Sequence, residues 1–199
     1  MFSRSTFERI GKIARLSIIA VWAMIVVICL TFYLFYPNKF APQEIAIFLR
    51  EFHGSIWLVY LAMSALRGIT LLPSTPLVIA GAIIFPDQLF WVFVVSITGI
   101  TLSSTMIYYF SEFLGFDEFF ENKNPALSEK LKRNLERPLG FLFVAGWAFF
   151  PIVPTDLVCY LAGTIRMRFI KFIAAILVGE SILCYFYIFL GGSLINKLW

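Results

Sequence analysis

Two apolar stretches that contain prolines and a charged residue constrain this chain more than any other feature. One of them, Phe149–Gly163, carries Pro151, Pro154 and Asp156 inside apolar sequence. A proline removes a backbone N–H and clashes with the preceding helical turn, and a bilayer offers no water to the carbonyl groups left unpaired. Such a break is stable only where protein buries it or where it lines a polar cavity. We therefore expect an interrupted helix here instead of a plain membrane-spanning one.

The second stretch, Arg67–Gly81, has the same elements. Each stretch holds Pro-x-x-Pro, a hydroxyl residue, an Ala-Gly pair and one nearby charge, and the prolines here are Pro73 and Pro76. An ionisable group at membrane depth is costly unless a partner or water compensates for its burial. Arg67 and Asp156 are therefore candidates for a functional site.

The composition is that of an integral membrane protein, because 60% of the residues are hydrophobic and 14% are charged. The formal net charge of +4 is concentrated at the ends of apolar segments. Basic residues in these positions contact anionic lipid head groups and determine membrane topology. We therefore expect membrane lipids, and no nucleic acid, as partners. The three cysteines have no spacing typical of a metal site or a disulfide framework. Since no zinc, nucleotide or phosphate-loop motif appears, we expect no metal and no cofactor.

The intact apolar runs predict spanning helices. We expect residues 1–36 to form a cytoplasmic amino terminus and a first transmembrane helix. Its apolar run, Ile13–Tyr36, is longer than the core of a signal peptide, about 7–15 residues, and has no small-x-small cleavage site. Residues 37–53 are expected to form an interfacial connection with a short amphipathic helix. Two further spans are predicted at Gln88–Phe110 and Phe172–Leu194.

The two interrupted segments, residues 54–85 and 138–165, are too short for two crossings each, which need about 40 residues plus a turn. A re-entrant hairpin, which enters and leaves by one face, fits their length. Residues 111–137 form a charged linker between them. An amphipathic helix is expected in this linker, because Leu127 and Leu135 lie on one helical face with Leu131 between them.

The basic residues decide how the hairpins lie. If both segments are re-entrant, the basic residues of the amino terminus, the linker and Arg166–Lys171 all face the cytoplasm, as the positive-inside rule requires. The hairpins then enter from opposite faces, as in an inverted repeat. The predicted fold class is all-α: a polytopic integral membrane protein with two opposed re-entrant helical hairpins plus spanning helices. Its membrane domain covers residues 54–194, and residues 195–199 form a tail.

The order and spacing of these motifs resemble a known family. Pro151-x-x-Pro154-x-Asp156 followed by Ala162-Gly163, and the earlier Pro73-x-x-Pro76 with Ala80-Gly81, resemble the VTT domain of the DedA and SNARE-associated Golgi protein superfamily. The resemblance covers roughly Gly54 to Leu194. It implies two opposed re-entrant hairpins and movement of phospholipid or polyprenyl-phosphate lipids across a bilayer. Many bacterial members have an arginine before the second proline region, where this chain has Trp147 and Ala148.

The predicted transport site consists of Arg67, Asp156, Glu180 and Thr155. Arg67 is the natural cation for a lipid phosphate, and Asp156 or Glu180 could pair with it or carry a proton. The alternatives stay open: Arg67 as a buried ion-pair partner only, and Asp156 as the N-cap of the helix after Pro154. We expect the hairpins to be shaped by Pro73, Pro76, Gly81, Pro151, Pro154 and Gly163. Arg166 and Arg168 are predicted as topology anchors or head-group contacts.

The predicted function is lipid transport between leaflets by a scramblase or flippase, with proton coupling left open. The alternative is a non-transporting assembly or trafficking scaffold. No enzyme is expected and no catalytic residue is assigned. His53, the one histidine, lies in the predicted interfacial loop and not at membrane depth, and Asp156 with Glu180 is a poor match to an aspartyl mechanism. We expect a bacterial plasma membrane, with a eukaryotic Golgi or endoplasmic reticulum membrane as the alternative. Assembly into a homo-oligomer and the identity of the lipid stay open.

Overall fold

The computed structural model describes residues 4–114, 123, 125–151 and 153–191, and every described regular element is a helix. Side chains at positions 4–14, 127 and 128 also lie outside the described part. The predicted tail 195–199, the face position Leu127 and the basic side chains of the amino terminus before Arg15 therefore fall outside it. The prediction of an all-α fold is confirmed for the residues described.

Among the described residues, three helices are long and apolar enough to cross a membrane: α1 (Arg4–Phe35), α5 (Leu89–Phe113) and α10 (Phe169–Tyr185). A π-helical turn, Phe186–Leu190, continues α10, and a 3-10 turn, Pro86–Gln88, precedes α5. All three agree with the predicted spans to within a few residues. The prediction of an integral membrane protein is confirmed.

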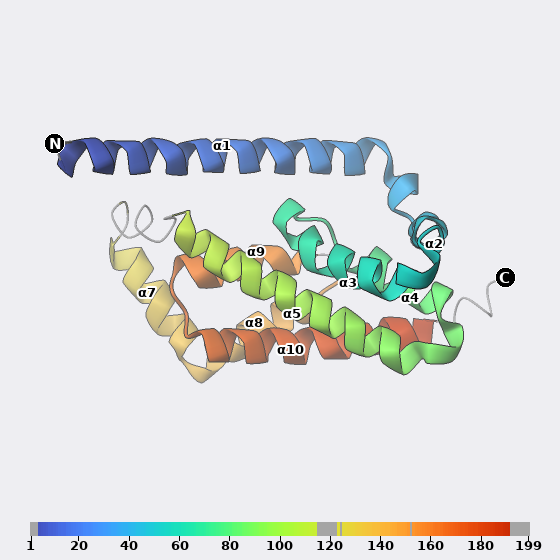
Figure 1. Ribbon diagram of the computed structural model, residues 1–199. Coiled ribbons are helices and arrows are strands. Elements are labelled where there is room, and N and C mark those ends of the chain that lie inside the picture. Colours follow the sequence, from blue (N-terminus) through green and yellow to red (C-terminus); the bar gives the residue numbers. More distant parts are fainter. Residues whose placement is uncertain (1–3, 115–122, 124, 152, 192–199) are drawn as a thin grey trace.

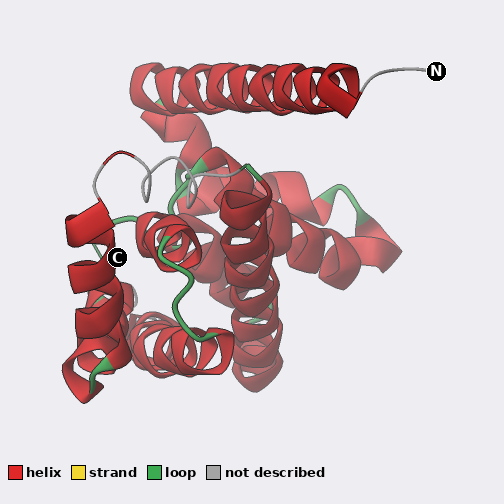
Figure 2. Ribbon diagram, turned by 90° about the vertical axis from the view of Figure 1, so that its left-hand side faces the viewer, coloured by secondary structure: helices red, strands yellow, loops and turns green. Residues whose placement is uncertain are grey.

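The three long helices differ in how much of their surface the protein covers. Only 6% of the apolar window of α1 is buried, against 39% for those that contain α5 and α10. Figures 1 and 2 both show α1 lying along one side of the bundle. α1 is therefore an outlying helix, whereas α5 and α10 form the centre.

A helix that follows α1 turns the chain sharply. After the 3-10 turn Pro37–Phe40, α2 (Pro42–Arg50) buries Ala46 and Leu49 against the bundle and leaves Phe48 exposed. The axis then bends by 116° between α2 and the segment His53–Thr70.

The first interrupted segment forms two short helices joined by a break. α3 (Ile56–Leu66) continues into a 3-10 turn, Arg67–Thr70, and α4 (Thr75–Ile84) follows. Leu71 lies in the break at φ 59°, a left-handed conformation that costs a non-glycine residue energy. We call the break, residues 67–74, the first tip.

The second interrupted segment has the same construction. α7 (Pro125–Glu136) leads into α8 (Pro138–Phe149), and α9 (Thr155–Thr164) follows the break. We call the break, with Phe150, Pro151, Val153 and Pro154, the second tip. The two pairs of helices approach each other from opposite ends of the molecule, α3 and α4 from the α2 end, α8 and α9 from the α7 end (Figure 1).

Small residues bring the short helices close to the long ones. A methyl group at Gly163 in α9 would overlap the Tyr108 backbone carbonyl of α5, and one at Gly179 in α10 would overlap the Ala145 carbonyl of α8. The core between these helices is apolar and fully buried. It includes Ile100, Ile107, Val144, Val158, Phe172 and Ile176.

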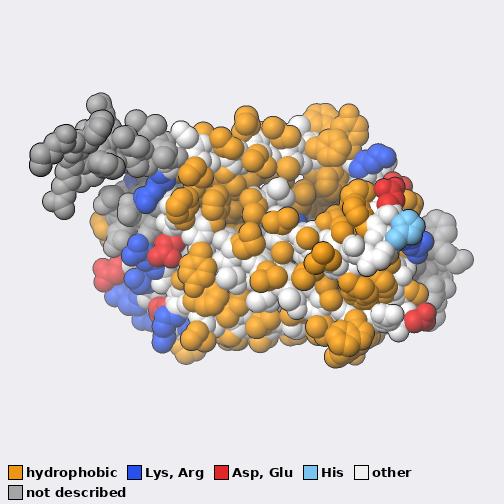
Figure 3. All heavy atoms as spheres, in the orientation of Figure 1, with side chains coloured by type: hydrophobic (Ala, Val, Ile, Leu, Met, Phe, Trp, Pro, Cys, Tyr) orange, Lys and Arg blue, Asp and Glu red, His pale blue; other side chains and the backbone are white. Residues whose placement is uncertain are grey.

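Polar residues close the α7 end of the bundle. The Arg168 backbone N–H donates to Glu136 Oε1 at 2.9 Å, and Arg168 Nε donates to Oε2 at 2.6 Å. Lys171 Nζ donates to the carbonyls of Leu135 and Arg137, at the end of α7. Figure 3 shows lysine and arginine side chains gathered at this end of the molecule. We call the contact of Glu136, Arg168 and Lys171 the α7 corner.

Candidate functional site

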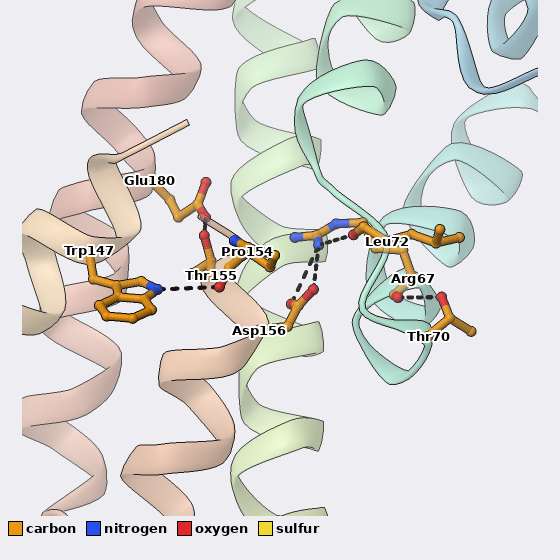
Figure 4. Close-up of polar contacts among 8 residues, drawn as sticks. All are labelled: Arg67, Thr70, Leu72, Trp147, Pro154, Thr155, Asp156 and Glu180. Atoms are coloured by element: carbon orange, nitrogen blue, oxygen red, sulfur yellow. Dashed lines mark hydrogen bonds and ion pairs between the residues drawn. The ribbon is translucent and has the colours of Figure 1, made fainter. Parts of the chain in front are cut away.

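The candidate site lies where the two tips meet, and an ion pair joins them (Figure 4). Arg67 Nη1, in the first tip, lies 3.2 Å from Asp156 Oδ2 and 3.4 Å from Oδ1. Only 8% of the Arg67 side chain and 2% of the Asp156 side chain are exposed. The structure therefore brings together the two charges that the sequence singled out, from positions 89 residues apart.

The first tip folds around its own arginine. Arg67 Nη1 also donates to the Leu72 carbonyl at 3.1 Å, and Thr70 Oγ1 donates to the Arg67 carbonyl at 2.7 Å. Gly68 permits this close packing, because a methyl group there would overlap Ser103 of α5 and lie 3.0 Å from Asp156 Oδ1. The guanidinium is thus held by the break itself as well as by the second tip.

Asp156 sits in the first turn of α9, where the positive end of the helix dipole favours a carboxylate. The residue at the N-cap position is Pro154, and no side-chain cap bond is formed. Of the two roles considered for Asp156, the structure shows the carboxylate as the partner of Arg67.

A second buried acid lies beside the ion pair. Thr155 Oγ1 donates to Glu180 Oε1 at 2.6 Å, which connects the start of α9 to α10. Glu180 Oε2 is buried and has no hydrogen-bond partner among the described residues. Trp147 Nε1 donates to the Pro154 carbonyl at 3.3 Å, which links α8 to the start of α9. The four predicted transport residues therefore form one cluster around the tips.

Two cavities adjoin this cluster. A cavity of about 560 Å³ lies between the end of α1, α2 and α4, and one of about 340 Å³ lies between the end of α1 and the two tips. Arg67 lines both, and Asp156 and Thr155 line the smaller one. All described hydrogen bonds of the Arg67 guanidinium use Nη1, so Nε and Nη2 have no hydrogen-bond partner among the described residues. A buried guanidinium with unused donors at a cavity can bind a phosphate or carboxylate oxygen.

The other predicted residues lie at or near the tips, or at the α7 end. Pro73 lines both cavities, Pro76 the larger one, and Pro151 and Pro154 the smaller one. Gly81 faces Tyr60, whose hydroxyl would be 2.6 Å from a methyl group added there.

Arg166 and Arg168 lie away from the tips. Arg168 binds Glu136 at the α7 corner, and Arg166 Nε lies 4.0 Å from Glu112 Oε1. Their described partners are carboxylates at the end of the bundle. The structure does not bring them to the cluster around Arg67.

Sequence reasoning missed the contribution of α1. Trp22 Nε1 donates to the Ile69 carbonyl in the first tip at 3.0 Å, and Tyr33 lines both cavities. Both are aromatic residues within a long apolar run, so the sequence carried no signal that separated them from lipid-facing neighbours. Among the described residues, no group of three or more His, Cys, Asp or Glu side chains could hold a metal ion.

Comparison with known proteins agrees with the resemblance seen in the sequence. The model of the VTT domain family matches residues 72–193, which contain the second tip, Asp156 and Glu180. Arg67 lies just before the match, and α1 and α2 lie outside it. Searches of curated proteins and of solved structures find no match. The matched region is more than half of the chain, and the protein therefore belongs to the VTT domain family, the domain of the DedA and SNARE-associated Golgi proteins.

Proposed function

We propose that this protein moves a phosphate-bearing lipid between the leaflets of a bilayer, and that the head group binds Arg67 between the two tips. The observation that carries this proposal is the buried Arg67 guanidinium, which lines both cavities and keeps donors unused by the protein. Burying such a charge costs free energy, and apolar residues can often replace an ion pair whose role is only structural. Binding of a transported anion would explain why the charge is kept.

The proposed topology follows from the opposed helix pairs. Each pair is a re-entrant hairpin, and together they form an inverted repeat whose tips meet near the bilayer midplane. Arg168 and Lys171 contact the end of α7, so the basic residues of the linker and of Arg166–Lys171 lie at one end of the bundle. We place this end, with the amino end of α1, on the cytoplasmic side of a bacterial plasma membrane.

In the proposed mechanism the phosphate exchanges with Asp156 as the partner of Arg67. The guanidinium offers its unused donors first, and Asp156 keeps the positive charge compensated while the tip is empty. Glu180, held by Thr155 and buried with one unpartnered oxygen, is the group that could carry a proton during this exchange. No covalent step is needed, so the proposed activity is transport and not catalysis.

Leaflet exchange of a fluorescent phospholipid in proteoliposomes tests the proposal. Wild type should exceed empty liposomes, and Arg67→Ala should lower the protein-dependent rate by about 10–100-fold, since a hydrogen bond to a charged group contributes about 1.5–3 kcal/mol. Arg67→Lys should retain part of the rate. The matched control is Arg50→Ala, which removes an exposed arginine that lines neither cavity.

Two results would count against this function. If wild type matched empty liposomes with and without a proton gradient, exchange of ordinary phospholipid would be excluded, and a polyprenyl-phosphate carrier would be assayed next. If Arg67→Ala and Asp156→Asn folded and kept the wild-type rate, the tips would not be the transport site. If Arg67→Ala and Asp156→Asn also kept the wild-type function in a cellular assay, the scaffold alternative would be favoured.

A further inference from the structure

We infer that Tyr33 of α1 forms, with Arg67 and Pro73, the constriction between the two cavities, so that Tyr33 controls how fast a head group passes. The inference rests on the proposed lipid transport for its substrate. The position of the constriction follows from the two cavity linings, because Tyr33, Arg67 and Pro73 line both the larger and the smaller cavity. A group moving from one cavity to the other therefore passes between them.

The larger cavity opens toward the α2 end of the molecule. Its lining includes Lys39, Glu44 and Glu51, which are exposed residues of the connection between α1 and α3. The smaller cavity lies between the tips and includes Asp156 and Thr155. The two cavities thus lead from the α2 end of the bundle to the buried ion pair, and Tyr33 lies between them.

Tyr33 forms the side of the constriction that can move, because it lies on α1. Only 6% of its apolar window is buried, so a small displacement of α1 breaks few contacts with the bundle. Trp22 contacts the bundle: its Nε1 donates to the Ile69 carbonyl at 3.0 Å, and its ring centroid lies 5.3 Å from that of Tyr160 and 6.0 Å from that of Phe110. Tyr33 packs against Phe40, in the turn after α1, at a ring-centroid distance of 5.1 Å. Arg67 and Pro73, in contrast, belong to a tip fixed by the ion pair and by the Leu72 carbonyl.

The first test changes the size of residue 33 and measures phospholipid exchange in proteoliposomes. Tyr33→Ala should raise the rate several-fold, Tyr33→Trp should lower it, and Tyr33→Phe should leave it unchanged, because the ring and not the hydroxyl narrows the passage. Tyr36→Ala is the matched control: Tyr36 directly follows α1, is 55% exposed and lines neither cavity. Equal rates in all Tyr33 variants, or loss of rate in Tyr33→Phe alone, would overturn the inference.

A second measurement does not depend on transport. Ser74 lines the smaller cavity but not the larger one, so Ser74→Cys places a thiol beyond the constriction. The background carries Cys29→Ala, since Cys159 and Cys184 are buried. A cationic methanethiosulfonate reagent should modify this thiol faster with Tyr33→Ala and more slowly with Tyr33→Trp.

The two measurements separate the inference from the proposed function. If wild type moves no lipid but the thiol rates follow the size of residue 33, the constriction stands and the lipid proposal fails. If wild type moves lipid and neither rate responds to residue 33, the lipid proposal stands and the constriction fails.

Discussion

The tips and the α7 corner contain the same kind of contact in opposite surroundings. Arg67 and Asp156 lie 3.2 Å apart with 8% and 2% of their side chains exposed. Arg168 and Glu136 lie 2.6 Å apart, yet 74% and 25% of their side chains are exposed. The exposed pair is the shorter one, but water and salt screen it, so distance alone does not rank the two.

Burial, and not the distance between the charges, decides what each pair does. An exposed ion pair contributes little, because both charges are well solvated without it. A buried pair need not stabilise the fold more than apolar residues would, but each charge depends on the other. We therefore expect the tips to be intolerant of single substitutions and the α7 corner to tolerate them. Three predictions test this contrast.

The largest effect is expected for Asp156→Asn. It leaves the Arg67 charge buried without its partner, which costs about 3–5 kcal/mol of unfolding free energy. Unfolding by denaturant in detergent micelles measures the loss. Glu136→Gln, at the exposed pair, is the matched variant and should cost about 1 kcal/mol or less.

A double substitution completes this test. Arg67→Met combined with Asp156→Leu removes both charges and should recover most of the stability lost in Asp156→Asn, because neither charge is left unpaired. It should not recover phospholipid exchange. Equal losses in Asp156→Asn and Glu136→Gln would remove the contrast between the two regions.

An intermediate effect is expected for Thr155→Val. This substitution deprives the buried Glu180 carboxyl of its described donor, which costs about 1–3 kcal/mol of unfolding free energy. The control is Thr98→Val, because Thr98 is exposed on α5 and its hydroxyl donates to the Val94 carbonyl one turn earlier. Similar small losses in both variants would mean that burial of Glu180 does not depend on Thr155.

The smallest effect is a pH dependence at the α7 corner. Partial burial acts to raise the pKa of Glu136, but hydrogen bonds from the Arg168 backbone and guanidinium outweigh it, so the pKa lies below its ordinary value. A lowered pKa adds stability that is complete above the unfolded value, about 4.3, and is lost as the pH falls through the folded value.

Thermal unfolding of wild type and Glu136→Gln between pH 6 and pH 3 measures this contribution. The wild-type advantage should shrink as the medium becomes more acidic and should also shrink in high salt. A wild-type advantage that grew toward pH 3 would have the wrong sign and would contradict a lowered pKa of Glu136.

Sequence reasoning identified the residues of the tips but left open whether Asp156 or Glu180 pairs with Arg67. Arg67 and Asp156 stood out because a charge in apolar sequence is costly. The prolines, which follow Arg67 and precede Asp156, predicted the helix breaks next to them. That the guanidinium meets the carboxylate follows from packing between segments 89 residues apart, which no local pattern encodes. The choice between a cap and a partner for Asp156 likewise needed the position of the first tip.

The rest of the site was hidden for a different reason. A helix in a bilayer is apolar on every side, so periodicity does not show which side faces protein. Trp22 and Tyr33 therefore looked like any other aromatic residue of the first span. The left-handed Leu71 was equally invisible, since glycine and asparagine are the residues that usually mark this conformation.

The slight burial of α1 has an evolutionary consequence. Its outward face meets lipid tails, which accept any apolar side chain of moderate size, so selection on that face is weak. Leu16, Met24 and Ile28, all more than half exposed, are free to drift among aliphatic residues. Trp22, which donates to the first tip, and Tyr33, which lines both cavities, are positions of α1 where a replacement would alter the inner surface. Related chains are thus expected to diverge around a helix in which two aromatic residues persist.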